Sequence, residues 1–349
     1  MDRTITYTPL IREVSEQEVA DYRRVARAQR PPAELVMQII VGVIAGFIVL
    51  VVLTTVLVPA ITIGISGIAS GDSTAVFAIL PGIMIIGVIA VVIVSVLRRG
   101  GPLWRERLRM HRFAEANGFV YEITSPAPDY PGMIFGLGRS RKVSDHFRTL
   151  DGRFLDFGNY QYTTGSGKNS TTHRWGFLAL QLDRALPHIV LDSRANNGLF
   201  GATNLPSGLS RDQVLSLEGD FDRYFTLYCP KQYERDALYV FTPDLMALAI
   251  DEAAPFDMEI VDQWLFVYSA RPFPLADPYI YQRLLRIVST VGAKALSQTD
   301  RYRDERIGDV NVNLVAPQGQ RLKKGVPWVG IAIIAVVSVA WMLMVVSGF

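Results

Sequence analysis

Apolar residues gather in three long runs, 35–58, 76–97 and 328–347, and no run holds a charged side chain. Each run has 20 to 24 residues. An α-helix rises about 1.5 Å per residue and the hydrocarbon core of a bilayer is about 30 Å thick, so each run is long enough to cross a membrane. Helices buried in soluble cores rarely stay uncharged over such lengths. The pattern therefore predicts three transmembrane helices.

Between the second and third runs the pattern changes to short apolar stretches that are typical of β-strands. Strands at 143–149 and 153–163 flank Asp151-Gly152, a dipeptide that favours a tight turn. Further strands are predicted at 175–177, 188–192, 213–217, 224–228, 237–241, 256–261 and 264–269. We expect most of these strands to pair antiparallel.

Helix signals accompany the strands. Ser15 and Glu18 have the spacing of a capping box, which predicts a polar helix that ends near Arg30. Further helices are predicted at 102–117, where Gly118 stops the helix, at 242–253, which opens on Thr-Pro-Asp, and at 278–297. The fold class is therefore α+β: three transmembrane helices and a domain of mostly antiparallel strands with a few helices.

The same pattern divides the chain into five segments. They are an N-terminal tail with a short helix (1–34), a transmembrane helical hairpin (35–97), an α+β domain (98–300), a polar linker (301–326) and a C-terminal transmembrane helix (327–349).

Charge sets the expected orientation of these segments. All 35 lysines and arginines lie in 1–34 or 98–324, and the 59–75 connection has none. The positive-inside rule therefore predicts a multi-pass membrane protein with the N-terminus and the main domain in the cytoplasm and the C-terminus outside. Six arginines after the second run are expected to contact anionic headgroups of the bilayer: Arg98, Arg99, Arg105, Arg107, Arg109 and Arg112.

Composition excludes several functions. Residues 98–324 carry 29 basic and 26 acidic side chains, so the basic excess of a nucleic-acid-binding domain is missing. Cys229 is the only cysteine, which rules out an intramolecular disulfide. The four histidines have no metal-ligand spacing among themselves or with Cys229. We therefore predict no metal, no cofactor and no catalytic residue.

Two short stretches are candidates for interaction with a partner. Gly165-Ser166-Gly167-Lys168 lacks the first glycine and the final Ser or Thr of a phosphate-binding loop, and a strand follows it where a helix should. It is read as an exposed hairpin tip, with Gly165, Lys168 and Asn169 as candidate contacts. Asp220 and Asp222, with Arg223, form a second candidate, for which a turn with solvated acids is the simpler reading.

Several stretches resemble a family of uncharacterised multi-pass membrane proteins of Actinobacteria. They are Pro131-Gly132-Met133-Ile134-Phe135, Gly158-Asn159-Tyr160 through Trp175-Gly176, Gly219-Asp220-Phe221-Asp222-Arg223-Tyr224-Phe225, and Tyr233-Glu234-Arg235-Asp236-Ala237-Leu238 with Phe241-Thr242-Pro243-Asp244. The resemblance covers about residues 105–305. It implies a bacterial inner-membrane protein and brings no activity or catalytic residue with it.

Three functional hypotheses follow. The first is a non-enzymatic membrane protein whose cytoplasmic domain binds another protein or senses a cytoplasmic state. The second is a membrane-anchored enzyme with a site assembled from residues distant in sequence. The third is a transport accessory subunit, which the absence of ionisable residues from the three runs disfavours. Each leaves a homo-oligomer open.

Overall fold

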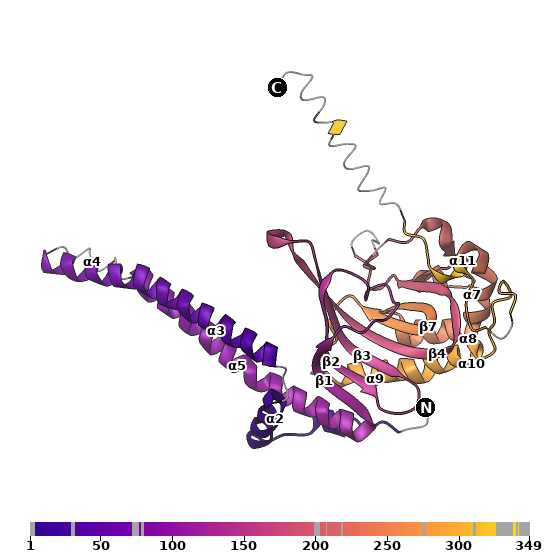
Figure 1. The fold of residues 1–349 in the computed structure, drawn as a ribbon, viewed down its shortest axis with the longest axis horizontal. Coiled ribbons are helices and arrows are strands. Elements are labelled where there is room, and N and C mark those ends of the chain that lie inside the picture. Colours follow the sequence, from indigo (N-terminus) through magenta and orange to yellow (C-terminus); the bar gives the residue numbers. More distant parts are fainter. Residues whose placement is uncertain are drawn as a thin grey trace. The chain divides into compact units, whose positions relative to one another are not determined.

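The structure is a computed structural model that describes residues 4–28, 32–71, 77, 80–198, 203–206, 208–217, 219–274, 277–309, 312–325, 338–339 and 341. It divides into two compact units, one of residues 10–110 and one of residues 1–9 and 111–349 (Figure 1). The predicted membrane helix at 328–347 lies outside the described residues, except for 338, 339 and 341.

The unit of residues 10–110 is helical. Its elements are α2 (Glu16–Ala28), α3 (Pro32–Val52), the π-helical turn η1 (Leu53–Leu57), α4 (Val58–Ala69) and most of α5 (Leu80–Asn117). The predicted capping box starts α2: the Ser15 backbone N–H donates to Glu18 Oε2 at 2.7 Å, and the Glu18 N–H donates to Ser15 Oγ at 3.3 Å.

One stretch of this unit has the length and composition of a membrane-spanning helix. Among the described residues, Gly42–Gly67 is the only such stretch, with 26 residues and a mean hydropathy of 2.7. It overlaps the first predicted run. Of the three predicted membrane helices, the described part of the chain therefore shows one.

The predicted loop at 59–75 is wrong over residues 59–69, because α4 extends the helix to Ala69. Pro59 has no N–H to donate to the carbonyl four residues earlier, and the π-helical turn η1 ends two residues before it, at Leu57. The Thr54 hydroxyl donates to the Leu50 carbonyl at 3.0 Å and the Thr55 hydroxyl to the Val51 carbonyl at 2.7 Å. Wider turns and hydroxyl bonds of this kind let an apolar helix continue through a proline.

The second unit is built on a seven-stranded antiparallel sheet (Figure 1). The strands are β1 (Phe119–Pro126), β2 (Arg139–Thr149), β3 (Leu155–Thr164), β4 (Thr171–Ser193), β5 (Val214–Leu215), β6 (Phe225–Tyr228) and β7 (Asp257–Ser269), in the order β1-β2-β3-β4-β6-β5 with β7 paired to β4. The predicted α+β class with antiparallel strands is confirmed.

Helices connect and cover the strands. They are α6 (Phe221–Tyr224), α7 (Glu234–Val240), α8 (Pro243–Leu248) with η7 (Ala249–Ala253), α9 (Pro278–Ile287), η8 (Val288–Gly292), α10 (Ala293–Thr299) and α11 (Pro317–Gln320); α1 (Thr8–Ile11) is a single turn near the N-terminus. The predicted helices at 242–253 and 278–297 are confirmed.

Aromatic side chains fill both faces of the sheet. On one face Phe147 stacks on Phe157 at 5.0 Å, and Tyr281 of α9 meets the Phe147 ring edge-on at 5.5 Å. On the other face Phe135 packs against Tyr160 and Phe266. Such rings bury large apolar areas, so the domain has the core of an independently folded unit.

Two local predictions are wrong and one strand was missed. Residues 237–241 belong largely to helix α7, where Ala237 and Val240 are buried three residues apart and the residues between them are exposed. The strands at 256–261 and 264–269 are one strand, β7, which continues through Asp262 at a positive φ of 52°. Strand β1 was not predicted.

The segment expected to be a polar linker, 301–326, contributes buried side chains to the α+β unit. Tyr302, Val315 and Leu322 are all buried. Asp304 is also buried, and it accepts hydrogen bonds from the Tyr233 hydroxyl and from the Ala316 N–H at 2.8 Å. This carboxylate fixes the path of the segment across the domain.

Candidate functional site

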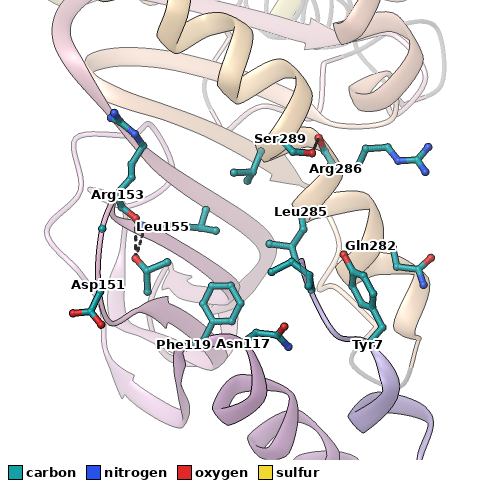
Figure 2. Close-up of a pocket in the computed structure, with 15 residues that line it drawn as sticks. Tyr7, Asn117, Phe119, Asp151, Arg153, Leu155, Gln282, Leu285, Arg286 and Ser289 are labelled. Atoms are coloured by element: carbon teal, nitrogen blue, oxygen red, sulfur yellow. Dashed lines mark hydrogen bonds between the residues drawn. The ribbon is translucent and has the colours of Figure 1, made fainter. Parts of the chain in front are cut away.

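A cavity of about 880 Å³ opens in the α+β unit, beside the β2–β3 turn and the helix pair α9–η8 (Figure 2). Its walls come from the N-terminal segment, the end of α5, the start of β1, the β2–β3 turn, and α9 with η8. This volume is in the range of sites for small organic ligands.

The floor of the cavity is apolar. Phe119, Leu155 and Leu285 converge on the same space in Figure 2, and Val288 adds to the lining. All four side chains are almost fully buried in the domain. A floor of this kind favours a hydrocarbon group over water.

Asn117 holds one wall in place. Its Oδ1 accepts from the Thr6 N–H at 2.8 Å, and its Nδ2 donates to the Thr6 carbonyl at 3.0 Å and to the Phe113 carbonyl at 2.8 Å. These bonds attach the N-terminal segment to the end of α5, where Gly118 turns the chain at a φ of 73°. The attachment positions Ile5 and Tyr7 in the cavity wall.

Tyr7 brings a polar group into this apolar wall. Its ring stacks on Phe113 with a centroid distance of 5.9 Å. Burial raises the pKa of the Tyr7 phenol, and the positive charge of Arg286 opposes that rise. The hydroxyl makes no hydrogen bond to the described part of the chain, so it is available to a ligand.

The charged residues of the rim differ in how they are engaged. The Arg153 guanidinium is held by Asp183 through bonds of 3.0 and 2.9 Å and points away from the cavity in Figure 2. Arg286 is 67% exposed and meets Glu252 only at 3.8 Å. Arg286 also extends away from the cavity floor in Figure 2, but it is held less tightly than Arg153, so it is the rim cation that is freer to pair with an anionic ligand.

The predicted hairpin between residues 160–162 and 175–177, with its tip at 165–170, is present in the structure. Strands β3 and β4 pair up to Thr164 and Thr171, and Gly165 turns the chain at a φ of 75°. Lys168 and Asn169 are exposed in a single 3-10 turn, Gly167–Asn169. The tip is a surface element with no part in the core.

The second candidate, Asp220 and Asp222 with Arg223, lies at a turn. Asp222 Oδ1 accepts from the Leu217 N–H at 3.2 Å, and Asp222 Oδ2 accepts from the Ser216 hydroxyl, so this residue closes a turn. Asp220 and Arg223 are exposed. Helix α6 is followed by Phe225, which pairs with Ser193 at the C-terminal end of β4. The hairpin tip lies at the N-terminal end of β4, before Thr171. The structure therefore does not bring the two candidate surfaces together.

The arginines predicted to meet lipid headgroups also have protein contacts. Within the helical unit Arg105 pairs with Glu16, Arg109 donates to the Arg12 carbonyl at 3.0 Å, and Arg107 lies 5.4 Å from the centre of the Trp104 ring. The side chains of Arg98 and Arg99 are outside the described residues, and Arg112 belongs to the α+β unit. Part of this basic cluster thus holds α2 against α5.

One constellation has the atom order of a Ser-His-Asp triad. Ser125 Oγ lies 2.6 Å from His146 Nε2, and His146 Nδ1 lies 3.1 Å from Asp156 Oδ1. Glu122 Oε2 also reaches Nε2, at 2.9 Å. Pro126 follows the serine and has no N–H to stabilise an oxyanion. This cluster was not predicted, because strand β1, which carries Ser125 and Glu122, was not expected.

A second buried network ties the chain after α11 to the sheet. Glu259 accepts from His188 Nε2 at 2.7 Å, from the Tyr268 hydroxyl at 2.7 Å and from the Met133 N–H at 2.8 Å. His188 Nδ1 in turn accepts from the Leu322 N–H at 3.0 Å, which places the ring proton on Nε2. The Glu259 carboxylate and both ring nitrogens of His188 therefore have hydrogen-bond partners inside the domain, and the network serves to hold the domain together.

Cys229 is buried. Desolvation, with the nearby charges of Glu234 and Asp236, raises the pKa of its thiol to about 12. The thiolate is therefore scarce at neutral pH, which agrees with an inert cysteine.

No protein-family model and no curated protein matches this chain. Among solved structures, the crystal structure of the mycobacterial trehalose monomycolate transport factor A, TtfA, is similar over 54% of this chain and 93% of that chain, with 13% sequence identity and a TM-score of 0.37. The resemblance to an actinobacterial membrane family stays a prediction.

Proposed function

We propose that this chain is a membrane-anchored binding protein that senses a small amphipathic molecule, an apolar chain with an anionic head, in the cavity of its α+β domain. The observation that carries the proposal is the cavity itself, with an apolar floor of Phe119, Leu155 and Leu285. Orientation and specificity in such sites come from a few polar groups at the mouth. Tyr7 and Arg286 supply a hydroxyl and a positive charge there.

The membrane helices fit this proposal. The Gly42–Gly67 stretch is long and apolar enough to anchor the chain in a bilayer. Amphipathic molecules concentrate in membranes, so a tethered domain meets them at a high local concentration. The cytoplasmic side remains the side that the arginine distribution predicts.

A photoreactive fatty-acid analogue tests the proposal. With the full chain in lipid nanodiscs, we expect the label on peptides that contain Tyr7 or residues 282–289. Leu285→Trp fills the cavity and should lower that labelling at least tenfold. Leu238→Trp, at a side chain that is 51% exposed and outside the cavity, is the matched control.

Substitutions of arginine test the role of positive charge at the rim of the cavity. Arg286→Gln should weaken labelling by the fatty-acid analogue but leave labelling by an uncharged alcohol analogue unchanged, because only the anion loses a partner. Arg174→Gln, at an exposed arginine of β4, should change neither. Equal labelling of the wild type and Leu285→Trp would contradict the proposal.

The triad-like cluster favours an alternative, a membrane-anchored hydrolase. In that case Ser125 would react with a fluorophosphonate probe, and Ser125→Ala, but not Ser144→Ala, would abolish the labelling. We rank it second because Glu122 shares His146 Nε2 with Ser125 and because Pro126 removes a backbone donor.

A further inference from the structure

The N-terminal segment forms a separate piece of the cavity wall. Ile5 and Tyr7 line the cavity, whereas Thr4 and Thr6 are exposed. This alternation is that of an extended chain, in which successive side chains point to opposite sides. One side of the segment therefore faces the cavity and the other faces solvent. Residues 4–7 are called the N-terminal wall below.

Few interactions hold the N-terminal wall to the domain. None of the described strands pairs with it. The Asn117 side chain bonds to both backbone groups of Thr6, because it accepts from the N–H at 2.8 Å and donates to the carbonyl at 3.0 Å. The Tyr7 ring adds a stacking contact with Phe113, at 5.9 Å. Segments with few buried contacts open at a small free energy compared with the whole domain.

The rest of the cavity is built into the core. Phe119, Leu155 and Leu285 are at most 8% exposed. Asn117 is also buried, and its bond to the Phe113 carbonyl at 2.8 Å fixes the direction in which its amide points. Opening of the N-terminal wall therefore leaves the floor of the cavity and Asn117 in place.

The N-terminal wall carries a polar group that can meet the head of a ligand together with the rim cation. The positive charge of Arg286, on α9, acts on the Tyr7 phenol, so the two groups are near each other. An anionic head that bonds to both joins the N-terminal wall to α9. Such a ligand has contacts with Tyr7 that exist only while the wall is closed.

We propose that the N-terminal wall opens to admit the ligand and closes over it, and that Asn117 is the residue that holds the closed state. This inference rests on the proposed function, because the ligand that stabilises the closed state is the amphipathic molecule with an anionic head. Contacts made only in the closed state shift the population toward that state. A wall of this kind controls how fast the ligand leaves.

Amide hydrogen exchange of the full chain in lipid nanodiscs measures the opening. The Thr6 N–H donates to Asn117 in the closed state, so its exchange requires the wall to open. Saturating palmitate should slow exchange at least threefold in N-terminal peptides that cover residues 4–7. Asn117→Ala should speed the same exchange at least tenfold when palmitate is absent.

Asn313→Ala is the matched control. The Asn313 amide also holds a backbone segment, because its Oδ1 accepts from the Ala185 N–H at 2.9 Å and its Nδ2 donates to the Asp183 carbonyl at 3.3 Å. Asn313 is not among the residues that line the cavity. This variant should leave the exchange of residues 4–7, and the effect of palmitate on it, unchanged.

Release of the photoreactive fatty-acid analogue gives a second measurement. Excess palmitate is added, and the label captured on residues 282–289 is followed as the delay before irradiation increases. Asn117→Ala should speed dissociation at least tenfold. Thr6→Pro removes the same N–H and leaves Asn117 unchanged, so it should have the same effect and decides the case if Asn117→Ala fails to fold. Thr6→Ala keeps both backbone groups and should release the analogue at the wild-type rate.

The outcomes separate this inference from the proposed function. A wild type without saturable labelling overturns both. If the wild type is labelled but palmitate does not change the exchange of residues 4–7, the movable wall is overturned and the cavity stays a fixed binding site. Dissociation at the wild-type rate from folded Asn117→Ala and from Thr6→Pro has the same meaning.

Discussion

At the scale of single residues, Asp257 couples the stability of the domain to pH. Desolvation raises the pKa of this carboxyl from 3.8 to about 7 in the folded chain. An acid with a raised pKa binds its proton more tightly when folded than when unfolded. Its contribution is therefore most favourable below about pH 4 and is lost as the pH rises through about 7.

This coupling gives a prediction for the full chain. Its melting temperature should contain a component that falls between about pH 4 and pH 7. Asp257→Asn removes the titrating group and should flatten that component, whereas the exposed Asp244→Asn should not. Scanning fluorimetry across this pH range measures it, and parallel pH profiles for the wild type and Asp257→Asn would contradict the assignment.

Glu259 is the residue on which the buried network depends. It accepts three hydrogen bonds, so a carboxylate fits and an amide must turn a donor toward another donor. Glu259→Gln should lower the free energy of unfolding by about 2–3 kcal/mol, and Tyr268→Phe by only about 1 kcal/mol, since it removes a single donor. Melting of both variants in detergent ranks them, and the reverse order would show that the tyrosine governs the network.

At the scale of elements, local chemistry was readable from the sequence and tertiary contacts were not. The Ser15–Glu18 capping box and the Asp151-Gly152 turn depend on residues at most a few positions apart, so both were predicted correctly. The cavity unites Tyr7 with Leu285, which only folding brings together. The alternation of Thr4-Ile5-Thr6-Tyr7 was the available signal for the N-terminal wall.

The hairpin tip can be tested as an element. Because Thr164 pairs with Thr171, a two-residue Asn-Gly turn in place of residues 165–170 keeps the strand register. The melting temperature should change by no more than about 2 °C, since the tip contributes nothing to the core.

Crosslinking then separates the two readings of this element. If the tip is an interaction surface, the shortened chain should lose a partner that the full chain captures. If every partner survives, the tip is only a connection, and Asp220, Asp222 and Arg223 become the surface to change next.

At the scale of the whole molecule, the distribution of arginine and lysine along the sequence predicts how the chain is oriented in the membrane. The Gly42–Gly67 stretch is apolar throughout, and basic residues lie on the N-terminal side of the first run and after the second. Segments next to membrane spans that are rich in lysine and arginine stay on the cytoplasmic side. Two crossings before residue 98 and a third after 327 would put the α+β domain in the cytoplasm and the C-terminus outside.

Reporter fusions check this orientation directly. A reporter that is active only in the cytoplasm should work when it is inserted near residue 200 and should fail when it is fused after Phe349. The contrast arises because three crossings must leave the two positions on opposite sides. A reporter that is active only outside the cytoplasm is the matched control and should give the opposite pattern. Activity of the cytoplasmic reporter at both positions would mean that 328–347 does not cross, and failure near residue 200 alone would reverse the orientation.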